Sequence, residues 1–365
     1  MTERIHSTRL SLLLALLLIL IGTCVVLPAA ADDSRLEQGI AAYEAEDYER
    51  AYELLKPESE AGDPEAQYYV GQMYGFGLGV EKDLSNAVAI SRDAAEHGHP
   101  GAQETLAYAY FEGVVVDQDY EKAARWYEQA AENGNKTAQR SIGFRYKNGE
   151  GVERDYEKAA EWFHKAAEQG DDVASLELAI AYHHGQGVAQ DYERAAQWSR
   201  RAMEAGYARA QRLLAWQYVA GEGVDQDLDR AKTLYRDLLS EGEAQDQFAL
   251  GVLLQGEAEE NDDETLFREA YELFREAASQ GHELAMLNVG AHYSNGWGVE
   301  RDNMESTAWL LLSRAHGHAE AQMLIDHQLE YAWDADLEAS QARARELVRE
   351  LDLDVDDDQP FAQNE

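Results

Sequence analysis

A glycine recurs at a fixed interval along this chain, at positions 62, 98, 134, 170, 206 and 242, each 36 residues after the last. Gly281 follows after 39 residues, and Gly317 after another 36. A period in the range of about 20 to 50 residues indicates an array of stacked supersecondary units. The single longer step coincides with the acidic stretch at 259–264, where we predict that the three extra residues lengthen a loop.

Each period begins with the pattern of an amphipathic helix. The residue four positions after the marker glycine is alanine in every repeat except one, where it is Asp246. An aliphatic residue follows at offset 8, and six repeats have tyrosine at offset 12. Residues spaced by four lie on one face of an α-helix, so the pattern predicts the first helix of a helix pair.

A glycine-rich turn and a second helix complete the period. The turn has the form Gly-x-Gly-Val, as in Gly185–Val188, and its glycines are suited to positive φ angles. We expect the marker glycine to close the second helix as a left-handed cap. The turn is altered in the second repeat, which has Val115 where a glycine belongs, and the sixth repeat lacks several markers. An aspartate before an alanine-rich run is a natural N-cap of the second helix, and these residues are Asp83, Asp119, Asp155, Asp191, Asp227 and Asp302.

The repeats divide the chain into consecutive segments. Residues 32–61 are predicted to form an N-terminal helix pair that lacks the glycine turn, and residues 317–351 a partial repeat that ends in a capping helix, 337–351. Residues 352–365 are interpreted as an acidic disordered tail. The seven complete repeats are 62–97, 98–133, 134–169, 170–205, 206–241, 242–280 and 281–316.

Residues 1–31 have the features of an export signal. A basic start precedes an apolar run, and Ala29–Ala31 provides small residues for cleavage before Asp32. The hypothesis is a secretory signal peptide and a periplasmic or secreted mature protein. Two alternatives stay open, namely retention of the apolar run as a membrane anchor and lipidation of Cys24.

At this level of detail the repeats resemble the Sel-one-like repeat (SLR) family, a relative of the tetratricopeptide repeat. The resemblance rests on the 36-residue period, the Gly-x-Gly-Val turn, the Asp-Tyr-x-x-Ala-x-x-Trp second helix and an Ala-Gln pair such as Ala66–Gln67. It implies an all-α, right-handed α-solenoid of about nine helix-pair repeats. It also implies a scaffold or adaptor that binds partner proteins, in bacteria often in the cell envelope.

Composition argues against several other functions. The net charge of −40 disfavours nucleic acid as a partner, because phosphate binding needs clustered Lys and Arg. Cys24 is the sole cysteine, so the mature chain would have no thiolate metal site. No cofactor is predicted. The histidine pairs at 97/99, 183/184 and 316/318 lack a zinc-binding spacing, and the aspartates at 352, 354 and 356 lack the rest of a calcium loop.

No catalytic residue is assigned, because the sequence has no Gly-x-Ser-x-Gly elbow and no distinctive carboxylate pair. The alternative function is an envelope hydrolase or a cell-wall or β-lactam-related enzyme. A disulfide-rich branch of the SLR family has been linked to β-lactam chemistry, but that branch pairs cysteines within its repeats. The residues here do not support transferring that activity.

The predicted binding surface consists of first-helix residues at offsets 6, 10 and 13, which by analogy with tetratricopeptide grooves line the inner curve. Aromatic and arginine side chains are common anchors of protein interfaces. We expect an extended or helical partner segment with acidic and apolar residues to lie along the second to fifth repeats. Alternatively, Tyr108, Phe144 and Trp216 simply pack between helices. The predicted residues are Tyr68, Tyr108, Phe111, Arg140, Phe144, Lys147, His183, Arg212 and Trp216.

Overall fold

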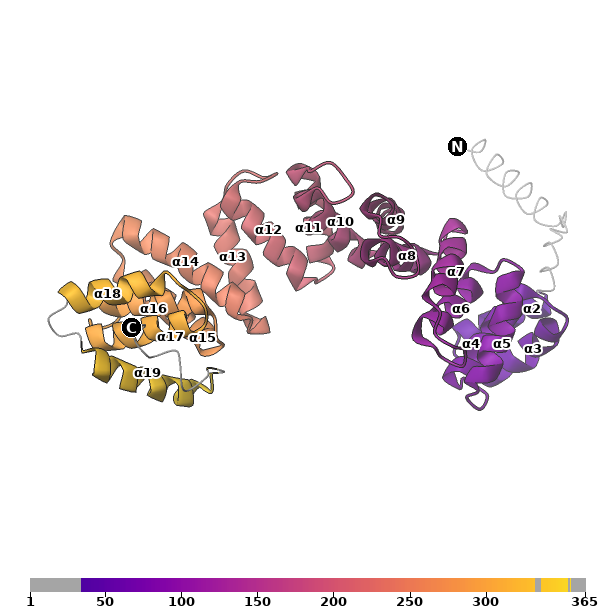
Figure 1. Cartoon of the computed structure of the whole chain (residues 1–365). Coiled ribbons are helices and arrows are strands. Elements are labelled where there is room, and N and C mark those ends of the chain that lie inside the picture. The colour runs from indigo at the N-terminus through magenta and orange to yellow at the C-terminus, as the bar shows by residue number, and fades with distance from the viewer. Residues whose placement is uncertain (1–33, 332–335, 354, 356–365) are drawn as a thin grey trace, which may run out of the picture. The chain divides into compact units, whose positions relative to one another are not determined.

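The computed structural model describes residues 34–331, 336–353 and 355 (Figure 1). These residues form eighteen α-helices and one short 3₁₀-helix, and no strand occurs among them. The prediction of an all-α solenoid of helix-pair repeats is confirmed. The predicted signal peptide lies outside the described residues. Within them, every helix is too short or too polar to span a bilayer.

The chain divides into two compact units, Met1–Arg154 and Asp155–Glu365. The boundary falls inside the third repeat, just before the aspartate that begins its second helix. In the first unit each helix packs against its neighbours in the chain (Figure 1). Its helices are α2 (Arg35–Glu44), α3 (Tyr48–Glu60), α4 (Pro64–Phe76), α5 (Leu84–Glu96), α6 (Pro100–Glu112), α7 (Tyr120–Glu132) and α8 (Lys136–Asn148).

The second unit continues the same arrangement, and α14 to α19 share a hydrophobic core with residues of α12 and α13. Near the C-terminus α17 packs against both α18 and α19. The helices are α9 (Tyr156–Glu168), α10 (Asp172–His184), α11 (Tyr192–Glu204), α12 (Ala208–Ala220), α13 (Leu228–Leu238), η1 (Leu239–Glu241), α14 (Ala244–Asn261), α15 (Glu264–Ser279), α16 (Glu283–Asn295), α17 (Asn303–Ala315), α18 (Ala321–Tyr331) and α19 (Leu337–Leu351).

The predicted helix boundaries follow from their caps. The six predicted aspartates are the N-caps of α5, α7, α9, α11, α13 and α17, and the side chain of each accepts a hydrogen bond from a first-turn amide. The marker glycines adopt positive φ angles where the second helices end, as predicted. The apolar stripe of the first helices is buried, with Ala138 and Ile142 of α8 both 0% exposed.

The second glycine of each turn is required by close packing as well as by its φ angle. At Gly187, φ is +73°, and a Cβ atom would lie 1.9 Å from the carbonyl oxygen of Tyr156 in the preceding second helix. Only glycine lets the turn approach that backbone so closely. The exception in the second repeat, Val115, keeps a positive φ of 67° although it is β-branched.

Two sequence predictions are corrected. The acidic insertion at 259–264 does not lengthen a loop, because α14 continues through it to Asn261 and α15 begins at Glu264. The insertion begins with two Glu residues, which favour helix, and the Gly-x-Gly turn that ends most of the other first helices is absent. Packing also extends beyond α19 into the predicted tail, because Leu353 and Val355 contact the core. The rest of the tail lies outside the described residues.

Candidate protein-binding surfaces

The nine predicted binding residues lie on first helices, but they belong to two units. Tyr68 is on α4, Tyr108 and Phe111 are on α6, and α8 carries the next three residues. The second unit holds the remaining ones, with His183 on α10 and the other two on α12.

Helix α8 concentrates positive charge in a strongly acidic chain. It carries Lys136, Arg140, Arg145 and Lys147 and contains no aspartate or glutamate. The Lys147 ammonium lies 5.8 Å from the centroid of the half-buried Phe144 ring. Cations held beside an aromatic ring form a surface that suits carboxylate and apolar groups.

Helix α6 adds an exposed aromatic residue and a carboxylate to the same unit. The Tyr108 side chain is 53% exposed, so it is not a core residue. Burial raises the pKa of Glu104 above its ordinary value, and the positive charge of Arg140 opposes that shift. Glu104 stands at offset 6 and was missing from the predicted set, although the offset rule that selected Tyr68 and Arg140 could have found it.

Tyr68 serves mainly to hold α4 against α6. Its ring stacks on His99 with a centroid distance of 4.5 Å, and Gly101 leaves room for it. Nδ1 of His99 in turn accepts a hydrogen bond from the Ala102 amide at the start of α6. Burial raises the pKa of the Tyr68 hydroxyl. For this residue, packing between helices describes its contacts better than display on a surface.

Phe111 is covered by an arginine that the sequence prediction did not include. The Arg145 guanidinium lies 3.8 Å from the Phe111 ring centroid, and its Nε is 3.1 Å from Oε2 of Glu150. Phe111 also contacts the ring of Tyr120, at 5.3 Å between centroids. The arginine thus contacts a ring of the preceding repeat and a carboxylate of its own repeat.

In the second unit the structure brings His183 and Trp216 together. Their rings meet edge to face at 5.2 Å between centroids, and Trp216 remains 42% exposed. Burial, and secondarily the neighbouring His184, lower the pKa of His183. The ring is therefore neutral near pH 7, and it lies beside an exposed indole that is available for stacking.

Arg212 is engaged within the protein. Its Nε and Nη2 atoms donate to the two carboxylate oxygens of Asp246 at 2.6 Å each. Asp246 is 0% exposed, and it occupies the offset-4 position where the other complete repeats have alanine. The one exception in the alanine pattern is thus explained by a bidentate ion pair between α12 and α14.

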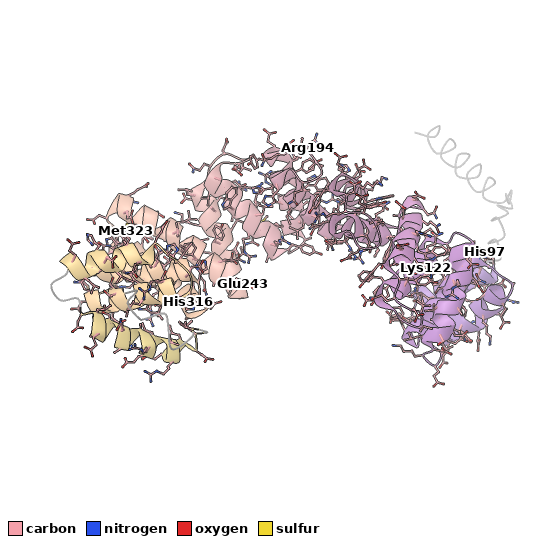
Figure 2. All side chains as sticks on the ribbon, viewed as in Figure 1. His97, Lys122, Arg194, Glu243, His316 and Met323 are labelled. Atoms are coloured by element: carbon pink, nitrogen blue, oxygen red, sulfur yellow. The ribbon has the colours of Figure 1, made fainter. Side chains whose placement is uncertain are left out.

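Cations on the second helices have a different setting. Lys122 on α7 pairs with Asp119 at 3.0 Å, and Arg194 on α11 lies 3.4 Å from Asp191; both cations are labelled in Figure 2. These partners are the N-cap aspartates of the same helices. Such exposed local pairs contribute little to stability. They make Lys122 a suitable control for the cations of α8.

Among the described residues, no group of three or more His, Cys, Asp or Glu side chains is placed to hold a metal ion. The histidines near the marker glycines have local roles. His99 and His282 cap α6 and α16, and His97 and His316 end α5 and α17.

The sequence pattern of the Sel1 repeat matches residues 64–99, 100–135, 137–171, 173–207, 208–236, 244–282 and 284–318. These matches cover more than half of the chain. The protein belongs to the Sel1 repeat family. Its matched repeats begin two or three residues after the marker glycines, at the start of each first helix. Helical repeats of this family generally serve as protein-interaction scaffolds.

Two solved structures agree with this assignment. The chain is similar to a protective antigen present in uropathogenic Escherichia coli strains that displays an SLR fold, with 31% identity, a TM-score of 0.68 and coverage of 87% of this chain and 68% of that one. It is also similar to a Sel1 repeat protein from Oxalobacter formigenes, with 29% identity, a TM-score of 0.52 and coverage of 77% and 96%. No curated protein matches the sequence.

Proposed function

We propose that this Sel1 repeat protein is a non-enzymatic scaffold whose first unit binds a partner protein through α6 and α8. The observation that carries the proposal is the charge of α8, which has four Lys or Arg residues and no carboxylate in a chain of net charge −40. Exposed Tyr108 and half-buried Phe144 add apolar contact area to these cations. This combination fits a partner segment with acidic and apolar residues.

The energetic expectation follows from the chemistry of interface anchors. Arginine and aromatic residues dominate measured interfaces, and truncating one such anchor typically costs about 2 kcal/mol or more. The overall negative charge would slow association with most acidic partners. Local cations on α8 would therefore select an acidic segment that can reach them, which gives specificity as well as affinity.

The proposed place of action is the cell envelope, as a periplasmic or secreted protein cleaved before Asp32. The support is the N-terminal sequence, with its basic start, apolar run and Ala29–Ala31. Mass spectrometry of the exported protein should find Asp32 at the N-terminus. A chain that starts at Met1 in the membrane fraction would favour the anchored alternative, and a lipidated Cys24 would favour the lipoprotein.

The binding test compares variants that lose the same charge. Arg140→Ala/Lys147→Ala removes two cations from α8, and Lys122→Ala/Arg125→Ala removes two exposed cations from α7. Crosslinking and pull-down from native envelopes should recover less partner with the α8 variant and normal amounts with the α7 variant. Equal recovery from both folded variants would contradict the assignment to α8. Loss with the α7 variant alone would place binding on the second helices.

The aromatic contribution is tested separately with Tyr108→Ala/Phe144→Ala. We expect reduced recovery here as well, with a helical circular dichroism spectrum like that of the parent. The alternative function, an envelope hydrolase or β-lactam-related enzyme, is tested by assaying the purified protein on cell-wall and β-lactam substrates. Turnover that one point mutation abolishes would favour the enzyme.

A further inference from the structure

The contact between Phe111, Arg145 and Glu150 has a counterpart two repeats further along the chain. The equivalent positions there are His183, Gln217 and Glu222, and both sets lie at a joint between adjacent first helices. The local frame is the same at both joints. Phe111 contacts Tyr120 at 5.3 Å between ring centroids, and His183 contacts Tyr192 at 5.4 Å. What differs is the residue in the middle, where arginine is replaced by glutamine.

In the first unit, Nε and Nη1 of Arg145 and Oε2 of Glu150 are buried without a hydrogen-bond partner, although Nε and Oε2 form an ion pair at 3.1 Å. The second-unit joint has four buried polar atoms without a hydrogen-bond partner and no cation of its own among these three residues. They are Nδ1 of His183, Oε1 and Nε2 of Gln217, and Oε2 of Glu222. Gln217 is 0% exposed, and Nδ1 of His183 lies 3.9 Å from Oε2 of Glu222, too far for a hydrogen bond. A buried polar group without a partner costs about 1–3 kcal/mol, so a cluster of them at one joint calls for an explanation.

At two other joints of the second unit, the residue at the same position has at least one partner within the chain. The residue equivalent to Gln217 is His292 in the seventh repeat, and its Nδ1 lies 2.8 Å from the carbonyl oxygen of Trp297. In the eighth repeat it is Gln328, whose Nε2 donates to the Ser294 hydroxyl at 2.7 Å while its Oε1 is buried without a partner, so of the two glutamines only Gln217 has both amide atoms unpartnered. Helix packing at a joint therefore does not by itself prevent a polar residue there from finding partners.

We propose that the joint formed by His183, Gln217 and Glu222 binds the guanidinium group of an arginine from a partner protein. Arg145 shows within this chain how such a group is held at these positions, with its guanidinium carbon 3.8 Å from a ring centroid and its Nε 3.1 Å from the carboxylate. In the second unit the carboxylate is Glu222, the amide oxygen of Gln217 is a further acceptor, and Trp216 offers an exposed ring.

The proposal rests on the proposed function as a scaffold and adds a second feature to its partner. The acidic and apolar segment expected at α8 has a counterpart in an arginine that contacts α10 and α12. The large net negative charge favours the approach of a basic group. Arginine fits better than lysine, because the planar guanidinium can stack and donate several hydrogen bonds at once.

The test follows the Trp216 indole signal of the ¹⁵N-labelled full chain by NMR, with Trp216→Phe used to assign it among the seven tryptophans. The probes are acetyl-Ala-Ala-Xaa-Ala-Ala-amide peptides in which Xaa is arginine, lysine or citrulline. We expect saturable shifts with arginine and about ten-fold weaker binding with citrulline, which keeps the shape but loses the charge. Equal shifts with all three peptides, or none with arginine, would overturn the proposal; in the latter case bound water accounts for the buried atoms.

Three variants sharpen the test. Glu222→Gln should weaken the arginine peptide at least about ten-fold, whereas its first-unit counterpart, Glu150→Gln, should leave the titration unchanged. Gln217→Arg restores the residue found in the third repeat, so it should abolish peptide binding and raise the melting temperature. If Gln217→Arg does not fold, Glu222→Gln still decides, because that side chain is 27% exposed and its replacement is nearly isosteric. Unchanged binding by Glu222→Gln would contradict the site.

The outcomes separate this inference from the proposed function. If the arginine peptide binds but removing the α8 cations does not change partner recovery, the second-unit site is supported and the first-unit surface is contradicted. If recovery depends on α8 but the peptide does not bind, the scaffold function stands and the arginine site fails.

Discussion

The second and sixth repeats both depart from the pattern of their neighbours, and they accommodate the departure in different ways. In the second repeat Val115 replaces a turn glycine, yet the backbone keeps the left-handed conformation of the other turns, with φ of 67°. In the sixth repeat Asp246 replaces a buried alanine, and Arg212 of the preceding repeat supplies a bidentate partner. The first departure keeps the backbone conformation of the other turns, whereas the second adds an ion pair.

The difference reflects the size of the two penalties. A non-glycine residue in the left-handed region costs about 1–2 kcal/mol, which the packing of a repeat array can absorb. A buried carboxylate without a partner costs several kcal/mol, which a repeat cannot absorb unless a cation accompanies it. A strained backbone position can thus stand alone, but a buried charge requires a second substitution.

The largest expected effect comes from breaking the ion pair. Arg212→Ala leaves the Asp246 carboxylate, which is 0% exposed, without its partner and should lower the free energy of unfolding by about 3–5 kcal/mol. Arg212→Ala/Asp246→Ala restores the alanine of the other repeats and should recover most of that loss. Urea denaturation of the parent, both single variants and the double variant gives the coupling energy. Additive effects in this cycle would show that the two side chains act independently.

This pair is a contact of Arg212 that the binding prediction does not include. The sequence indicated separately that Asp246 breaks the alanine pattern and that Arg212 stands at offset 6 of the preceding repeat. Joining the two needs the distance between neighbouring first helices, which periodicity alone does not provide. Opposite charges in adjacent repeats, one of them at a buried offset, were the available signal.

The second prediction concerns the position of the second turn glycine, where one variant replaces glycine by alanine and the other replaces valine by glycine. Gly187→Ala places a Cβ atom 1.9 Å from the Tyr156 carbonyl oxygen and should cost at least about 2 kcal/mol, because both the φ angle and the contact are unfavourable. Val115→Gly relieves the φ strain of the folded state but raises the conformational entropy of the unfolded chain. The free energy of unfolding should therefore rise by about 1 kcal/mol. Denaturation midpoints should move in opposite directions. A stabilised Gly187→Ala variant would refute this description of the turn.

The third prediction uses the histidine caps next to these repeats. His282 begins α16, where its Nδ1 accepts from the Ala285 amide, and its ring stacks on Phe248 of the sixth repeat at 4.4 Å. Burial lowers the pKa of His282 below its ordinary value of 6.5, with Glu283 opposing the shift. The folded state therefore favours the neutral ring. Its contribution to stability is fully present above pH 6.5 and is lost as the pH falls through the lower folded pKa.

His282→Asn keeps a capping acceptor but removes the titration, as Asn135 does at the start of α8. The loss of stability between pH 7.5 and pH 5 should be smaller in this variant than in the parent by about 1 kcal/mol, the usual value of an N-cap. His97→Asn is the control, because His97 is exposed and ends a helix (Figure 2). Identical pH profiles for the parent and His282→Asn would show that the cap does not sense pH.

Much of the fold could be predicted because each repeat contains residues that mark where its helices begin and end. The six aspartate caps, the marker glycines and the terminal helix Leu337–Leu351 depend on short-range rules that the sequence displays directly. The length of α14 was not predicted, because the acidic composition of the insertion was interpreted as a loop. The glutamates there favour helix, and the missing Gly-x-Gly turn indicates that the helix continues. The binding surface was only partly predictable, since whether Phe111 or Arg212 is covered depends on neighbouring repeats.

The smallest expected effect concerns the start of the sixth repeat. Glu243, labelled in Figure 2, is the N-cap of α14 and makes no side-chain capping hydrogen bond, whereas Asp63 and Asp171 cap their first helices. A glutamate carboxylate is one methylene too long for the cap, so Glu243→Asp should gain about 0.5–1 kcal/mol without changing the charge beside Arg212. Asp171→Glu is the reciprocal change and should lose a similar amount. If both variants unfold at the parent's urea midpoint, capping does not limit the stability of these helices.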